Sequence, residues 1–347
     1  MSIYTNTSIC TNTSTCIEYI WVDPDGNYRT KCRVIYQEDI SLDDVPEWNF
    51  DGSSTNQSVS HDNTEVVIKP VAMFKDPFRG SNHKLVLCDC YEPGGNNPIS
   101  TNTRYYASTD VFSKKKKLEP WFGMEQEYFI LDQRTKLPLG YHPTKKQGQF
   151  YAGVGHTNVF GRNIAEYHLN MCIKAGINIS GVNAEVAPGQ WEFQVGPCTG
   201  IDMGDHLHVA RYLLYRTSEF FNVCITLEPK PLKGCEWNGS GCHTNFSTKK
   251  MRDKNGYDHI EKAIKKLEKC HKEHMANYGS GNEERMTGAN ETADYNKFSW
   301  SVGGRDVSIR VGNETFKNKQ GYFEDRRPSS NCDPYIVTAM IYATCCL

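Results

Sequence analysis

Two glutamates separated by a single residue lie in segment 121–131, which is rich in aromatic and β-branched residues. This composition predicts a strand, on which residues two apart share a face. Glu125 and Glu127 therefore point the same way, together with the apolar Phe129. On a buried face the two carboxylates would lose hydration and repel each other, so a cation would have to offset their charge. A metal site is one interpretation, and an exposed strand face is the other.

A second pair of carboxylates flanks Pro188 and Gly189. Proline followed by glycine is typical of a type II turn, which would fold the chain so that Glu185 lies opposite Glu192. Directly opposed side chains have Cβ atoms about 4.5–5.5 Å apart, where like charges destabilise a sheet. A shared cation would remove this repulsion, whereas two solvated glutamates on a surface hairpin would not need one.

A histidine follows the glycine-rich stretch 238–241 at the start of another predicted strand. Alternation along that strand places His243, Asn245 and Ser247 on one face. A single histidine is more often a structural residue than a ligand. Two further polar groups on the same face favour the ligand interpretation, and glycines commonly let the backbone approach a ligand closely.

Glu324 and Arg326 share a face if segment 321–328 is extended. They would form either a local ion pair or a metal-binding carboxylate beside a guanidinium that holds a substrate carboxylate or phosphate. Arg285, Arg305 and Arg310 precede them in a glycine-rich region suited to anions. Five carboxylates and a histidine indicate sites for hard cations such as Mg²⁺ or Mn²⁺.

These residues must be positioned by a strand-rich first part and a mixed second part. Strands are predicted at 16–22 and 28–35 around a turn at 23–26, and again near 65–68 and 84–89. Turn-forming residues between 91 and 98 indicate a domain boundary. Helices are predicted at 158–175, at 258–277 with Asp258 and Glu261 as a capping pair, and at 333–346.

Composition narrows the classes of function. The 347 residues carry 39 basic and 41 acidic side chains, for a net charge of −2, so we expect no nucleic-acid partner. We expect no membrane partner, since no apolar run reaches eighteen residues. We see no secretory signal and expect a cytoplasmic protein whose fourteen cysteines are thiols. Residues 1–15, rich in Thr, Ser and Asn, are expected to form a disordered leader.

Five segments resemble the motifs of glutamine synthetase of the eukaryotic type (type II), in order and at similar spacing. They are WNFDGSST at 48–55, GMEQE at 123–127, NAEV and QWE at 183–192, NGSGCHTNFS at 238–247, and GYFEDRRPS at 321–329. The resemblance covers residues 16 to 346. It implies an α+β fold, with a small N-terminal β-grasp domain at 16–97 and a catalytic domain at 98–347 built on a curved antiparallel sheet flanked by helices. It also implies a homo-oligomer of stacked rings, a decamer, with active sites between subunits.

The resemblance further implies two or more metal ions, Mg²⁺ or Mn²⁺, per site. One would be held by Glu127, Glu185 and Glu192, and another by Glu125, His243 and Glu324. Arginines that match those holding glutamate and the transferring phosphoryl group are Arg285, Arg305 and Arg326, and the glutamate pocket includes Asn238 and Gly239. Positions that match the ATP site are Trp121, Asn245, Ser247, Arg252, Arg310 and Tyr322. The ammonium site would combine Asp51 and Ser54 of a neighbouring subunit with Tyr151 and Glu291.

The implied activity is ATP-dependent ligation of ammonia to the γ-carboxylate of L-glutamate through γ-glutamyl phosphate, which yields L-glutamine, ADP and phosphate. Asp51 would accept the proton of ammonium, and Glu291 would be a lid that excludes water. A ligase for larger amines and a catalytically dead structural relative are the rival hypotheses. Asn290 departs from the histidine that relatives carry before the lid glutamate, segment 59–65 differs, and the chain stops early at Leu347.

Overall fold

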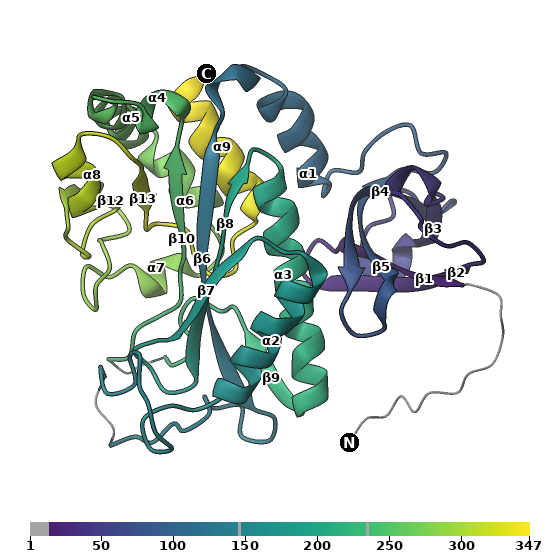
Figure 1. The fold of residues 1–347 in the computed structure, drawn as a ribbon, viewed down its shortest axis with the longest axis horizontal. Coiled ribbons are helices and arrows are strands. Elements are labelled where there is room, and N and C mark those ends of the chain that lie inside the picture. Colours follow the sequence, from purple (N-terminus) through teal and green to yellow (C-terminus); the bar gives the residue numbers. More distant parts are fainter. Residues whose placement is uncertain (1–13, 145–146, 234–235) are drawn as a thin grey trace. The chain divides into compact units, whose positions relative to one another are not determined.

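The computed structural model describes residues 14–144, 147–233 and 236–347. The chain divides into two compact units, one formed by residues up to 102 with 174–176, the other by 103–173 with 177–347 (Figure 1). Residues 1–13 of the expected leader lie outside the described residues. Thr15, at its end, already belongs to the first strand.

The first unit contains a five-stranded sheet with the strand order β2-β1-β5-β4-β3. Its strands are β1 (Thr15–Val22), β2 (Tyr28–Ile35), β3 (Trp48–Asp51), β4 (Glu65–Asp76) and β5 (Gly80–Tyr91), with 3₁₀ turns at Leu42–Asp44 and Gly52–Thr55. Only β1 and β5 run parallel. The predicted turn at 23–26 is confirmed, since the Gly26 amide donates to the Asp23 carbonyl at 3.0 Å.

Strand β4 is longer than the sequence predicted. Proline cannot donate a ladder hydrogen bond, so Pro70 favours an end to the strand. The strand continues because the pairing with β5 shifts register between Pro70 and Ala72. The buried core under this sheet includes Ile17, Tyr19, Trp21, Phe50, Val66, Ile68 and Val86.

The second unit contains an eight-stranded sheet ordered β11-β12-β13-β10-β6-β8-β7, with β9 paired to β6. The strands are β6 (Trp121–Asp132), β7 (Ile179–Ala184), β8 (Gln190–Thr199), β9 (Val223–Thr226), β10 (Cys242–Ser247), β11 (Trp300–Val302), β12 (Ile309–Val311) and β13 (Phe323–Asp325). The expected antiparallel sheet is antiparallel except at one edge, where β11 and β12 run parallel. The sheet is therefore mixed.

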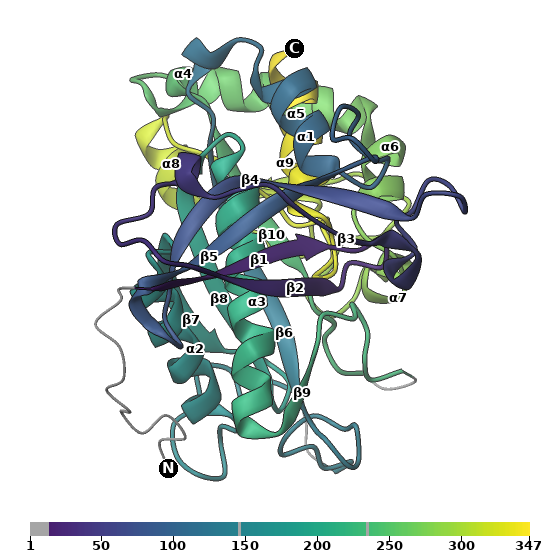
Figure 2. The ribbon, with the colours of Figure 1, turned by 90° about the vertical axis from the view of Figure 1, so that its right-hand side faces the viewer.

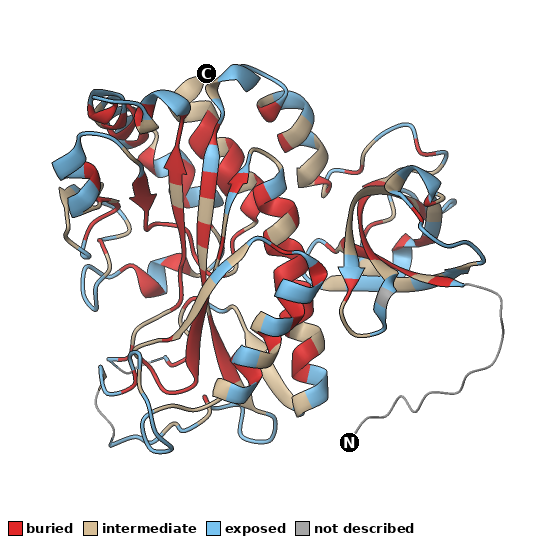
Figure 3. Ribbon diagram, viewed as in Figure 1, coloured by how far each residue is buried: buried red, intermediate tan, exposed pale blue. Residues whose placement is uncertain are grey.

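Helices accompany this sheet (Figures 1 and 2). They are α1 (Thr103–Tyr106), which continues as a π-helix over Ala107–Phe112, then α2 (Arg162–Ala175), α3 (Asp202–Phe221), α4 (Lys249–Arg252), α5 (Tyr257–Lys269), α6 (His271–Asn277), α7 (Asn282–Arg285), α8 (Asn313–Asn318) and α9 (Pro334–Cys346); a 3₁₀ turn spans Lys116–Leu118. Helix α3 packs against β8 and α9, and both helices are largely buried (Figure 3).

Two of the three predicted helices differ from the structure. The helix expected at 158–175 begins at Arg162, because Gly161 has a φ of +85° that a right-handed helix cannot contain. The helix expected at 258–277 is two helices, α5 and α6, separated at Cys270, whose φ of −100° and ψ of 13° leave the helical range. The capping pair was also wrong, since the N-cap is Gly256 and no side chain caps it.

The helices and cysteines of the described ranges bear on the membrane and disulfide expectations. None of the helices there combines the length and apolarity that crossing a membrane requires. None of the cysteines in the same ranges forms a disulfide, in agreement with the expectation of thiols.

The third predicted helix, at 333–346, is confirmed as α9, and Asp333 is its N-cap. The Asp333 carboxylate accepts hydrogen bonds from the amides of Tyr335 at 2.8 Å and Ile336 at 3.3 Å, and from the Thr103 hydroxyl at 2.6 Å. Asp333→Ala removes this cap and should lower the free energy of unfolding by about 1–2 kcal/mol. Asp333→Asn, which can still accept, is the matched control. Equal urea denaturation midpoints for the Ala variant and the wild type would show that the cap is dispensable.

Candidate metal centre and active site

Strand pairing brings the predicted ligands onto one face of the second sheet. Cross-strand partners share a face, and Glu127 pairs with Glu192, Glu125 with His243, and Glu324 with Asn245. Segments up to 200 residues apart in the chain thus meet on four neighbouring strands. Glu185 follows the end of β7 and lines the same cavity.

The register predicted for Glu185 and Glu192 was wrong. The turn exists, since the Gln190 amide donates to the Ala187 carbonyl at 3.2 Å and Gly189 has a φ of +66°. However, Glu192 pairs with Asn183, and the Glu185 amide donates to the Gln190 carbonyl. A type II turn does not match the twist of a two-residue hairpin, and the strands are joined instead by a longer loop that follows the contact between Glu185 and Gln190. The directly opposed carboxylates are Glu127 and Glu192.

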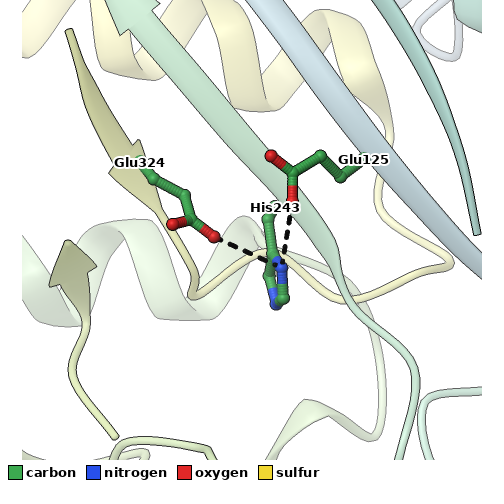
Figure 4. A group of neighbouring side chains, drawn as sticks. All are labelled: Glu125, His243 and Glu324. Carbon is green, nitrogen blue, oxygen red and sulfur yellow. Dashed lines mark ion pairs between the residues drawn. The ribbon is translucent and has the colours of Figure 1, made fainter. Parts of the chain in front are cut away.

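The first ligand group consists of Glu125, His243 and Glu324 (Figure 4). His243 Nδ1 lies 3.7 Å from Glu125 Oε2 and 3.5 Å from Glu324 Oε1. Burial, and then the charge of Arg326, hold the pKa of His243 well below its usual range. The imidazole is therefore neutral at physiological pH, and a neutral imidazole is the form that binds metals.

Glu324 also forms ion pairs with two arginines. Its Oε1 lies 2.7 Å from Arg326 Nη1, and its Oε2 lies 3.1 Å from Arg310 Nη1. The local ion pair that the sequence allowed is therefore present. Its geometry leaves the metal interpretation open, because the same carboxylate also faces His243.

The second ligand group is more crowded with negative charge. Ligand atoms of Glu127, Glu192 and His243 lie within 4.8 Å of one another. The pKa values of Glu127, Glu185 and Glu192 are each raised from 4.5 to about 8, first by burial and then by a neighbouring carboxylate. In the part of the chain that the structure describes, no ion pair neutralises these three side chains. A divalent cation would supply the missing charge.

Hydrogen-bond donors that the sequence analysis did not assign hold these carboxylates in place. Asn183 Nδ2 donates to Glu185 Oε1 at 2.8 Å, and Gln194 Nε2 donates to both Asn183 Oδ1 and Glu192. The available signal was the two-residue spacing of Asn183 from Glu185 and of Glu192 from Gln194, which places each pair on one strand face.

The glycines before His243 serve packing within the unit. A Cβ on Gly239 would lie 2.2 Å from the Pro229 carbonyl oxygen, and one on Gly241 would lie 2.9 Å from both Arg285 Nη1 and His243 Nε2. The Gly241 amide also donates to Glu127 Oε2 at 2.7 Å. Close approach is thus required, but toward the protein's own site residues.

Arginines and a loop complete the cavity. Arg285 is buried, and its Nη2 donates to the Arg327 carbonyl at 2.9 Å. Arg326 Nε donates to the Arg305 carbonyl at 3.0 Å, and the exposed Arg305 lies 3.6 Å from Glu291. The predicted residues that line this one cavity are Glu125, Glu127, Tyr151, Glu185, Glu192, Asn238, Gly239, His243, Arg285, Glu291, Arg305, Arg310, Glu324 and Arg326.

A second, more open hollow shares Glu125 with the first. Of the six predicted nucleotide positions, Arg310 lines the first cavity. The other five line this second hollow, and they are Trp121, Asn245, Ser247, Arg252 and Tyr322. The Arg252 guanidinium lies 3.9 Å from the centre of the Trp121 ring and donates to Ser247 Oγ at 2.9 Å. Exposed aromatic rings beside a fixed cation suit the stacking of a planar base.

Asp51 and Ser54 lie in the first unit and contact each other. Ser54 Oγ donates to Asp51 Oδ2 at 2.8 Å, and Ser53 Oγ donates to Asp51 Oδ1 at 2.7 Å. Hydrogen bonds from Ser53 and Ser54 lower the pKa of Asp51 to about 2. The carboxylate is exposed and ionised at neutral pH. Its place in the site of a neighbouring subunit stays a prediction.

Comparisons with known proteins identify the family to which the chain belongs. Residues 13–93 match the family model described as glutamine synthetase, beta-Grasp domain, which confirms the β-grasp prediction, and residues 102–276 match glutamine synthetase, catalytic domain. The chain is 51% identical over 333 residues to glutamine synthetase root isozyme 3 of Zea mays, with 94% of this chain and 92% of that protein covered. It is 52% identical to glutamine synthetase PR-1 of Phaseolus vulgaris (94% and 92% covered) and to the glutamine synthetase cytosolic isozyme of Daucus carota (94% and 93%).

The raised pKa values predict how pH and metal change stability. Between pH 4.5 and about 8 the folded protein keeps protons on Glu127, Glu185 and Glu192 that the unfolded chain has lost. Stability of the metal-free protein should therefore fall as pH rises through this window. Mn²⁺ should raise the melting temperature more at pH 8 than at pH 5.5, because it competes with those protons.

Thermal unfolding in EDTA and in Mn²⁺ across this pH range measures the effect. Glu127→Gln, which removes one titrating group, should flatten the pH dependence in EDTA. An increase in melting temperature that is the same at every pH would contradict this account of the cluster.

Proposed function

The chain belongs to the glutamine synthetase family, and from that premise we propose that it joins ammonia to the γ-carboxylate of L-glutamate at the expense of ATP. The observation that carries the proposal is the convergence of six ligand-type side chains on one cavity, beside buried arginines. The products are L-glutamine, ADP and phosphate.

Two divalent cations, Mg²⁺ or Mn²⁺, are assigned to this face. Glu127, Glu185 and Glu192 would hold one, and Glu125, His243 and Glu324 the other. Oxygen-rich sites with one neutral imidazole suit these metals, and the crowded carboxylates support the assignment. When bound, the metals would neutralise charge on the phosphates of ATP.

A carboxylate is a poor acyl acceptor, so the reaction begins with transfer of the γ-phosphoryl group of ATP to glutamate. Positioning and charge supply most of the catalysis of such transfers. Arg285, Arg305 and Arg326 would hold glutamate and the transferring group, with Asn238 and Gly239 beside them. The second hollow, with Trp121 and Tyr322 at its rim, would take the base of ATP, and Arg310 would reach its phosphates.

Ammonium must lose a proton before it can attack γ-glutamyl phosphate. A carboxylate with a pKa of about 2 is a strong counter-charge and a weak base, so Asp51 would first bind the cation, with Ser54 and Tyr151. It would take the proton as nitrogen bonds to the acyl carbon and its N–H groups become more acidic. Glu291 would cover the site and exclude water.

This arrangement requires two subunits at each site, because Asp51 and Ser54 are assigned to a neighbour. We therefore include a homo-oligomer of stacked rings, a decamer, in the proposal. A cytosolic location is included as well, since the Daucus carota relative is named a cytosolic isozyme.

Substrate omission tests the activity. Purified protein with glutamate, ammonium, ATP and Mg²⁺ should form glutamine and phosphate in equal amounts, and leaving out any one component should stop glutamine formation. Replacing ammonium with methylamine or ethylamine should slow the reaction strongly, because the proposed amine site is small and cationic. Absence of turnover in the complete mixture, or a preference for the alkylamine, would refute the proposal.

Glu324→Ala tests the metal assignment. The variant should lose one of two bound Mn²⁺ ions and, since such charge stabilisation is worth about 10²–10³-fold in rate, at least that much activity. The matched control is Glu314→Ala, an exposed glutamate in α8. Circular dichroism should show both variants folded. Turnover at the wild-type rate in Glu324→Ala would remove this residue from the site.

A further inference from the structure

Two consecutive arginines after β13 point to opposite sides of the chain. Arg326 pairs with Glu324 and lines the cavity. Arg327 has no exposed surface and forms a two-pronged pair with Asp325, with Nε to Oδ1 at 2.8 Å and Nη2 to Oδ2 at 2.7 Å. Strand alternation makes the division, since Glu324 and Arg326 share one face and Asp325 and Arg327 the other.

Two histidines of helix α6 contact the buried guanidinium of Arg327. Arg327 Nη1 lies 3.2 Å from His271 Nδ1, and Arg327 Nη2 lies 3.4 Å from His274 Nδ1. The pKa of each imidazole is lowered, first by burial and then by the charge of Arg327. Both histidines are therefore neutral, and His271 must accept at Nδ1 and carry its proton on Nε2.

The second nitrogen distinguishes the two histidines. His271 Nε2 lies 3.0 Å from the Tyr295 carbonyl oxygen, so this N–H donates to the backbone there. His274 Nε2 instead lies 2.8 Å from Thr344 Oγ1 in helix α9. Two buried imidazoles thus touch the same cation, but they connect it to different parts of the unit.

Tyr295 is the base of the loop that carries Glu291. The Tyr295 amide donates to the Met286 carbonyl at 2.9 Å, and Thr287 and Asp294 form an isolated antiparallel β-bridge, so the two ends of the loop are paired. At the tip, Asn290 and Glu291 both have positive φ values, 53° and 60°, which cost free energy for residues other than glycine. Contacts from outside the loop must therefore stabilise this conformation.

Two such contacts come from the pair of arginines. Arg326 Nη2 donates directly to the Glu291 carbonyl at 3.3 Å. The second contact is indirect, because Arg327 Nη1 donates to His271 Nδ1 and His271 Nε2 donates to the Tyr295 carbonyl. The loop is thus attached to the end of β13 at its tip and at its base, and β13 also carries the proposed metal ligand Glu324.

We infer that His271 is a positioning residue for the Glu291 loop, which it fixes to the buried Asp325–Arg327 pair behind the site. The inference rests on the proposed function, in which Glu291 excludes water from γ-glutamyl phosphate. Without the bond to Tyr295 the loop should open more often, and water should hydrolyse the acyl phosphate before ammonia reaches it. ATP would then be consumed without glutamine being formed.

His271→Phe and His274→Phe form a matched pair for the test. Each keeps a buried ring and removes one contact with Arg327, but only the first deletes the donor to Tyr295. The readout is glutamine formed per ADP, together with the KM for ammonium. Since one hydrogen bond changes an equilibrium by about fivefold, His271→Phe should lower the glutamine yield per ADP and raise the KM for ammonium by about that factor.

The controls separate this inference from the proposed function. His274→Phe should form equal amounts of glutamine and ADP, whatever its loss of thermal stability. His271→Gln, whose amide can donate to Tyr295, should restore most of the yield and remains usable if the Phe variant does not fold. Equal yields per ADP in all variants would overturn the role of His271. A wild type without glutamine synthesis would instead refute the proposed function.

Discussion

The stability of the second unit depends on three neighbouring carboxylates whose negative charges would repel one another. Glu127, Glu185 and Glu192 are held close together on a largely buried sheet face, where each raises the cost of ionising another. Fixed donors such as Asn183 and Gln194 prevent the carboxylates from turning away. At neutral pH such a cluster must either keep protons or bind cations, and the arginines nearby are paired elsewhere, with Glu324 or with backbone carbonyls. Divalent metals would remove the repulsion and would connect the stability of the unit to its proposed chemistry.

Strand β13 and the two arginines that follow it connect the proposed site to the buried interior behind it. The four consecutive residues 324–327 alternate between the face of the proposed metal site and a face that is fully buried. The buried pair Asp325–Arg327 gives the strand a rigid attachment to helix α6, and the same strand orients Glu324 and Arg326. Because one short segment carries both ion pairs, a substitution that displaces the Asp325–Arg327 pair behind the site should also displace Glu324 and Arg326.

Local pattern predicted which residues face together, and it could not predict which strands are neighbours. The two-residue spacing of Glu125 and Glu127 and the alternation of His243 and Asn245 were sufficient to give their common faces. The partner of Glu192 was wrong because a Pro-Gly turn does not fix hairpin register. The convergence of residues 125 and 324 came only from resemblance to a family, since no periodicity spans such a distance. The role of His271 had no signal in the sequence, because a buried histidine on an amphipathic helix looks like any core residue.

The central claim is that the crowded carboxylates exist to bind two dications. Anomalous diffraction at the manganese edge, from crystals grown with Mn²⁺, tests it most directly. The account predicts two peaks per subunit, one among Glu127, Glu185 and Glu192 and one among Glu125, His243 and Glu324. An empty face, or manganese bound only elsewhere on the molecule, would contradict it.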